Sequence, residues 1–175
     1  MKTIKTLLSL ALFTLMFHAG YSQNVSEMTK DWERAKAYTL EYLDAMPADK
    51  FDFKPTPEIR SFAEQMLHIT DANYGFIAAI AGIESPVGMG ESEKSTDTSK
   101  ENVTKLVSAG YDFVIEGIKG MSDAELSENI TLFGQFEMSK AQALAKTFEH
   151  QTHHRGQSTI YIRMAGVKPP NEKLF

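Results

Sequence analysis

The sequence predicts an all-α fold in which four helices pack as a bundle. Four segments repeat apolar residues at steps of three and four, which is the period of a helix that buries one face. Polar stretches rich in glycine, proline or serine separate these segments, and no convincing strand run is present. With 175 residues, of which 42% are hydrophobic, the chain fits one domain with an ordinary core.

The domain is expected to span residues 23–175, because residues 1–22 have the features of a secretory signal peptide. They begin with Lys2 and Lys5, continue with an apolar run from Leu7 to Phe17, and end in small residues. This apolar run is too short for a stable membrane anchor. We therefore expect cleavage after Ser22 and export, which places the mature protein in the periplasm or outside the cell.

The first two helices are predicted from their ends. Apolar residues recur from Met28 to Met46, and Pro47 ends this helix because proline lacks an amide hydrogen and clashes with the preceding turn. The second helix opens at Ser61, which caps free amides, while Glu64 three residues on reaches back to it. It runs to about Ala81, before a long polar connection.

The third helix is expected to begin near Thr98 or Ser99, with Glu101 completing the cap. It contains Gly110 and Gly117, which lower helix stability and indicate close contact with a neighbouring helix.

The last part of the chain combines a hairpin with the fourth helix. Alternation around Gly134 favours a short β-hairpin in residues 128–139. Ser139 and Gln142 then form a second capping box, and the helix extends to about Ala165. Gly166 is typical of the left-handed residue that follows a helix.

Three histidines lie within five residues of this fourth helix. His150 and His154 are four residues apart, so both rings lie on one helix face and reach a common point. His153 is turned by roughly 100° from His154. A metal site would need a third ligand from a facing helix, and His68 lies midway along the second helix. Spacing alone leaves both a metal site and a polar helix face open.

Other chemistries fit the sequence less well. A zinc-protease motif needs glutamate after its first histidine, where this chain has Gln151. There is no cysteine, no serine-hydrolase elbow and no phosphate-binding glycine loop. Asp71 lies three residues after His68, so it either orients a ligand ring or is a solvated charge.

Charge also restricts the partners. The full chain has 18 basic and 23 acidic residues, which gives a net charge of −5. Without residues 1–22, which contain two lysines, 16 basic and 23 acidic residues remain, and the net charge is 16 − 23 = −7. Nucleic acids and anionic membranes need Lys and Arg to neutralise phosphates, so neither is an expected partner.

Two segments resemble the DinB/YfiT-like family. "HQTHHRGQSTIYIRMAGVKPP", residues 150–170, is similar to the C-terminal signature of the family, and "SFAEQMLHITDANYGF", residues 61–76, is similar to its second-helix motif. The resemblance covers essentially all of residues 24–175. The matching positions of the first segment are His150, His154, Arg155, Gly156, Gln157, Tyr161, Arg163, Gly166, Pro169 and Pro170.

This resemblance implies a four-helix bundle of the DinB/YfiT-like type with a metal site of His68, His150 and His154. It implies a divalent ion, zinc or nickel, a small-molecule substrate or ligand, and in many members a homodimer. It also implies a hydrolase or an S-transferase that uses a low-molecular-weight thiol. Because most members are cytoplasmic, an exported chain departs from the thiol-dependent pattern.

The remaining motif residues have structural interpretations. Arg155 either binds substrate or forms an ion pair that fixes the helix, and we favour the ion pair. Gly156 is expected at a close helix contact. Tyr161 either lines the cavity or packs in the core, while His153 is exposed or supports a ligand. Two functions remain. The first is an exported metal-dependent enzyme whose general base is unidentified. The second is a non-catalytic bundle in the cell envelope that binds a metal or ligand and serves as a stress or interaction module.

Overall fold

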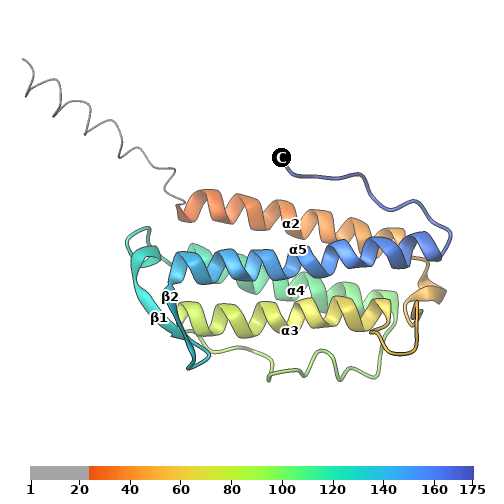
Figure 1. Ribbon diagram of the computed structural model, residues 1–175, viewed down its shortest axis with the longest axis horizontal. Coiled ribbons are helices and arrows are strands. Elements are labelled where there is room, and N and C mark those ends of the chain that lie inside the picture. The colour runs from red at the N-terminus through yellow and green to blue at the C-terminus, as the bar shows by residue number, and fades with distance from the viewer. Residues whose placement is uncertain (1–23) are drawn as a thin grey trace, which may run out of the picture.

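The structure, a computed structural model, describes residues 24–175, so the predicted signal peptide lies outside the described residues. Within this range four long helices form a bundle (Figure 1), which confirms the predicted fold class. The helices are α2 (Val25–Ala45), α3 (Phe62–Ala81), α4 (Lys100–Lys119) and α5 (Lys140–Met164). None of the helices in residues 24–175 is long and apolar enough to cross a membrane.

The predicted hairpin is also present and joins α4 to α5. Strands β1 (Asn129–Leu132) and β2 (Phe136–Ser139) pair in antiparallel register, with Leu132 opposite Phe136. Gly134 in the turn has a φ of 70°, a conformation that favours glycine.

The helices do not follow one another around the bundle. Helices α2 and α5 run in one direction, whereas α3 and α4 run in the other (Figure 1). Both α4 and α5 pack against α2 and against α3, so α2 and α3 lie at opposite corners. Because α3 and α4 are parallel neighbours, the link between them (residues 82–99) runs back along the length of α3.

Both predicted capping boxes are present. Ser61 Oγ accepts from the Glu64 amide while the Glu64 carboxylate accepts from the Ser61 amide, and Ser139 with Gln142 repeats this arrangement at α5. These reciprocal bonds satisfy amides that have no partner within the helix. The starts of α3 and α5, which carry the histidines, are therefore fixed locally.

The two other helices each start with a single side-chain cap, and the start of α4 at Ser99 agrees with the prediction of a start near Thr98 or Ser99. Asn24 caps α2 by accepting from the Glu27 amide, so this helix begins three residues before Met28, in a solvated turn that shows no apolar period. Ser99 caps α4 and accepts from the Asn102 amide. The predicted cap by Glu101 is wrong, because Asn102 occupies the third helical position.

Glycines bring α3 and α4 together as predicted. A Cβ atom on Gly110 would lie 2.9 Å from Thr70 Cγ2, and one on Gly117 would lie 3.1 Å from Ile77 Cγ2. Gly156 differs: a Cβ there would meet no atom within 4 Å, so its predicted helix contact is wrong.

Arg155 lies in the core, on a different face of α5 from the histidines. It is only 5% exposed, and its guanidinium carbon lies 4.5 Å from the centre of the Tyr38 ring. Its Nη1 donates to Gln151 Oε1 at 2.9 Å, and Tyr111 donates to the same oxygen. No carboxylate in residues 24–175 pairs with it, so the predicted ion pair is wrong. An aromatic face and an amide oxygen accommodate its charge instead.

Candidate metal centre

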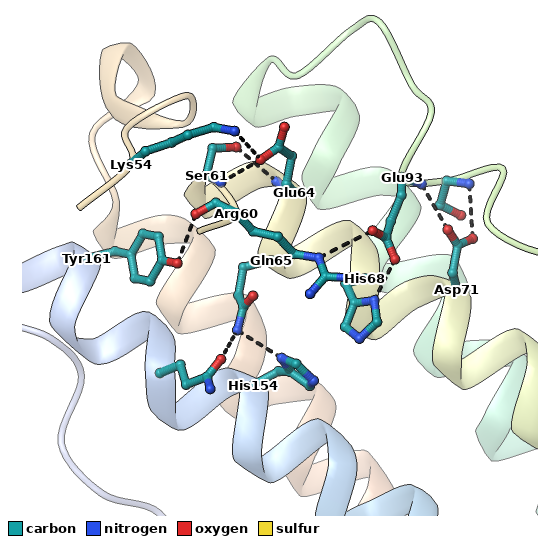
Figure 2. A network of polar contacts seen from close by, with 12 residues as sticks. Lys54, Arg60, Ser61, Glu64, Gln65, His68, Asp71, Glu93, His154 and Tyr161 are labelled. Atoms are coloured by element: carbon teal, nitrogen blue, oxygen red, sulfur yellow. Dashed lines mark hydrogen bonds and ion pairs between the residues drawn. The ribbon is translucent and has the colours of Figure 1, made fainter. Parts of the chain in front are cut away.

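Helices α3 and α5 bring three histidines together. His68 comes from α3, while His150 and His154 come from one face of α5, a turn apart. One ring nitrogen from each histidine lies within 4.8 Å of the other two. The ring centroids are 4.4 Å apart for His150 and His154, 4.5 Å for His68 and His154, and 5.2 Å for His68 and His150. Figure 2 shows His68 and His154 on the facing helices.

The rings of α5 are held in the form that binds metals. Burial, followed by the charge of His68, lowers the pKa of His150 to about 4. Burial, followed by the charge of His150, lowers the pKa of His154 to about 4. Both rings are therefore neutral at pH 7, and a neutral imidazole has the lone pair that a cation requires.

One ring nitrogen of the cluster lacks a partner. Nδ1 of His150 is buried and forms no hydrogen bond with any residue from 24 to 175. A buried unpaired nitrogen costs free energy. This unpaired nitrogen and the close approach of three imidazole rings make the cluster compatible with a divalent metal ion.

A carboxylate from the long link orients His68. Glu93 Oε1 lies 2.5 Å from His68 Nδ1, and its Oε2 accepts from Arg60 Nε at 3.3 Å (Figure 2). Asp71 accepts from the amides of Ser92 and Glu93, each at 2.9 Å. Both oxygens of Asp71 are thus occupied by backbone amides, so Asp71 does not orient a histidine ring directly but holds the segment that carries Glu93.

Glutamines perform the same role at His154. Gln65 Nε2 lies 2.8 Å from His154 Nδ1 and also donates to Gln157 Oε1. The Nε2 atom of Gln157 lies 2.9 Å from Nε2 of His153, which is exposed. If the side-chain amides of Gln65 and Gln157 are flipped by about 180°, Gln65 Oε1 accepts from Nδ1–H of His154. The Nε2 lone pair of His154 is then free to bind an ion. His153 is thus exposed and joined to the cluster through two amides.

A pocket of about 880 Å³ opens beside the cluster. Among the three histidines only His154 lines it, together with residues of the loop before α3 and of α5. Tyr161 both lines this pocket and is buried, and its hydroxyl donates to the Arg60 carbonyl at 2.9 Å. The lining residues are Lys54, Pro55, Pro57, Glu58, Ile59, Arg60, Glu64, Gln65, Glu93, His154, Gln157, Ile160 and Tyr161.

The residues around the cluster have little or no signal in the sequence. Gln65 carries a weak signal, because it is a polar residue three positions before His68 and therefore on a neighbouring part of the helix face. Glu93 carries none, since its position depends on the path of an irregular link. Arg60 likewise reaches the cluster only through the loop that precedes α3.

The chain belongs to the DinB family, whose profile matches residues 16–174. Among known proteins it is similar to the uncharacterized protein YrdA of Bacillus subtilis, with 24% identity over 153 residues that cover 85% of this chain and 87% of YrdA.

Solved structures show the same fold. A DinB-like protein from Bacillus cereus superposes with a TM-score of 0.76 at 20% identity, over 87% of this chain and 99% of that protein. The DinB-like protein YjoA from Bacillus subtilis gives a TM-score of 0.62 at 19% identity, over 85% and 96%. A conserved protein from Enterococcus faecalis gives 0.65 at 15% identity, over 80% and 95%. At these identities the similarity shows a shared fold, which is the four-helix bundle.

Proposed function

We propose that this protein binds one divalent ion, zinc or nickel, through His68, His150 and His154, and acts as a metal-dependent hydrolase or transferase on a small electrophile. The observation that carries the proposal is the convergence of three ring nitrogens within 4.8 Å, next to a pocket of about 880 Å³. Imidazole is a good ligand for both ions. Such an ion supplies Lewis acidity and lowers the pKa of water or of a thiol.

The chain's own residues orient the ligands and admit the substrate. Glu93 and Gln65 hold Nδ1 of His68 and of His154, which fixes the ring orientations. The pocket is in the size range of small-molecule sites.

Metal content tests this proposal directly. We expect about one ion per chain in untagged protein from residue 23, measured by mass spectrometry after incubation with zinc, nickel or manganese. His68→Ala and His150→Ala should lose the ion, because each removes one of three ligands. His153→Ala is the matched control and should keep it, since His153 is exposed and outside the cluster. A wild-type protein that stays empty with all three metals contradicts the proposal.

One observation favours a second function, that of a non-catalytic metal- or ligand-binding protein. Glu93, the carboxylate that contacts the cluster, has one oxygen on His68 and the other on Arg60, so it is not free to act as a general base. A screen of esters, amides and thiol–electrophile pairs separates the two functions. If metal-loaded protein turns over none of them, while metal binding persists, the binding role is the better account.

Export is part of the proposal. It is supported by the charged start, apolar run and small residues of residues 1–22. Expression of the full chain in a Gram-negative host should give periplasmic protein whose first residue is Gln23. An uncleaved protein in the cytoplasmic fraction would contradict export without affecting the metal site.

A further inference from the structure

Arg60 is a cation in the pocket with unused hydrogen-bond donors. Its Nε pairs with Glu93 at 3.3 Å, whereas its two terminal nitrogens, Nη1 and Nη2, form no hydrogen bond with residues 24–175. The side chain lines the pocket and is exposed. Figure 2 shows it reaching from the start of α3 toward His68. The outer face of the guanidinium is therefore available to a ligand.

The other donors near this pocket are occupied. Lys54 Nζ lies 2.9 Å from Glu64 Oε2, and the same carboxylate accepts from the Ser61 amide. The amides of Phe62 and Ala63, at the start of α3, donate to carbonyl oxygens of the preceding loop at 3.1 and 2.8 Å. The helix terminus thus has no spare amide here, and Arg60 is the strongest available donor for a ligand.

The charge of the pocket depends on the metal. Two cations, Lys54 and Arg60, line it beside three carboxylates, Glu58, Glu64 and Glu93, which leaves one negative charge. A divalent ion at the cluster changes this balance to one positive charge. An anion is therefore disfavoured by the metal-free pocket and attracted by the metal-loaded one.

We propose that the pocket binds a small molecule with a terminal oxyanion, a carboxylate or a phosphate, held by Nη1 and Nη2 of Arg60 while its other end faces the cluster. The fork of two parallel N–H groups matches the oxygens of either anion. Glu93 binds a different edge of the guanidinium, so it does not compete with the ligand. This inference names the substrate class of the proposed metal centre and rests on that proposed function.

Calorimetric titration of zinc-loaded protein tests the inference with three probes of equal chain length: butanoate, butyl phosphate and butanamide. We expect at least one of the anions to bind, and the uncharged amide to bind roughly tenfold more weakly or worse. Arg60→Gln should weaken binding of the anion by roughly tenfold or more, and Arg60→Lys severalfold, because lysine keeps the charge but lacks the fork. Arg163→Gln is the matched control: it removes the same charge from an exposed position of α5 outside the pocket, and affinity should not change.

Zinc stoichiometry, measured in every sample, separates the two possible failures. If wild type and Arg60→Gln both hold zinc and bind the anions equally, or if butanamide binds as well as butanoate, this inference is overturned and the metal centre stands. If wild type holds no zinc, the metal centre fails and the inference fails with it. If Arg60→Gln loses zinc while wild type keeps it, the anion affinity of zinc-loaded Arg60→Lys tests the inference instead. If Arg60→Lys binds both anions as tightly as wild type does, recognition by the guanidinium fork is overturned.

Discussion

The three histidines differ in what contacts the Nδ1 atom of each ring. Glu93 contacts Nδ1 of His68, Gln65 contacts Nδ1 of His154, and Nδ1 of His150 has no partner among residues 24–175. A carboxylate makes an imidazole more basic and fixes its tautomer, whereas an amide mainly orients it. His68 is therefore expected to be the most strongly supported ligand.

Glu93→Gln should weaken metal binding by roughly 10–100-fold, because the amide is a poorer acceptor for Nδ1–H than the carboxylate. Competition with a chromophoric chelator measures the dissociation constant. Glu91→Gln is the control: Glu91 lies in the same link, but its carboxylate pairs with Lys94, away from the cluster. Equal affinities of Glu93→Gln and wild type would show that Glu93 does not support the ligand.

The lowered pKa values of His150 and His154 make the metal-free protein sensitive to acid. Each ring has a pKa of about 4 when folded, against 6.5 when exposed. Below pH 6.5 the unfolded chain binds more protons than the folded chain. The contribution of these two histidines to the free energy of unfolding is therefore fully present above pH 6.5 and is lost as the pH falls toward 4. We expect a loss of about 1–3 kcal/mol, because solvent screens these half-buried rings.

Urea unfolding of metal-free protein at pH 7 and pH 4.5 measures this loss. The double variant His150→Gln/His154→Gln should show a smaller difference between the two pH values, since it lacks both groups. If the two proteins lose the same free energy on acidification, other residues account for the acid sensitivity.

At the scale of elements, the sequence predicts a feature well where the interaction is local. Both capping boxes join residues three apart, so the starts of α3 and α5 were predicted to the residue. Thr98 and Ser99 are both able to cap α4, and nothing local distinguishes them. Glu101 would complete the cap only if Thr98 were the capping residue, whereas Ser99 caps the helix, so the prediction for Glu101 is wrong. The role of a glycine depends on the helix that faces it. Gly110 meets Thr70, whereas Gly156 meets open space.

Gly110→Ala and Gly156→Ala should therefore have opposite effects on stability. At Gly110 the new methyl group would lie 2.9 Å from Thr70 Cγ2 and 3.4 Å from Thr70 Cα, so α3 and α4 must separate at a cost of about 1–3 kcal/mol. At Gly156 the methyl group meets nothing, and alanine should stabilise α5 by about 0.5–1 kcal/mol. Chemical denaturation of both variants measures these changes. Two destabilised variants would contradict the open surroundings of Gly156.

For the whole molecule, the sequence indicates how many helices form but not which of them are neighbours. An apolar stripe shows that a helix buries one face, but this face can pack against any of several other helices. The diagonal placement of α2 and α3, and with it the path of residues 82–99, follows from packing over long sequence distances. His68, His150 and His154 were predicted because a motif marks them, whereas Glu93 and Arg60 depend on these paths.

A metal ion at the cluster should stabilise the entire bundle, because its ligands lie on α3 and α5, about 80 residues apart in the sequence. At a free zinc concentration 100 times the dissociation constant, the gain is about 2.7 kcal/mol. This corresponds to a rise in Tm of about 5–10 °C for a domain of this size. Thermal unfolding with and without zinc measures it. His153→Ala should keep the rise and His150→Ala should lose it; equal rises in both would place the ion elsewhere.

The link between α3 and α4 also matters for how such proteins diversify. Because the two helices are parallel, the chain has to return along the bundle, and on the way it delivers Glu93 to His68. Residues of this return path do not belong to the helical core, so insertions, deletions or grafted segments there can change the surroundings of the histidine cluster while the scaffold and the three histidines stay intact. The segment from Gly82 to Ser99 is thus a natural place for selection, or for a protein engineer, to retune this site.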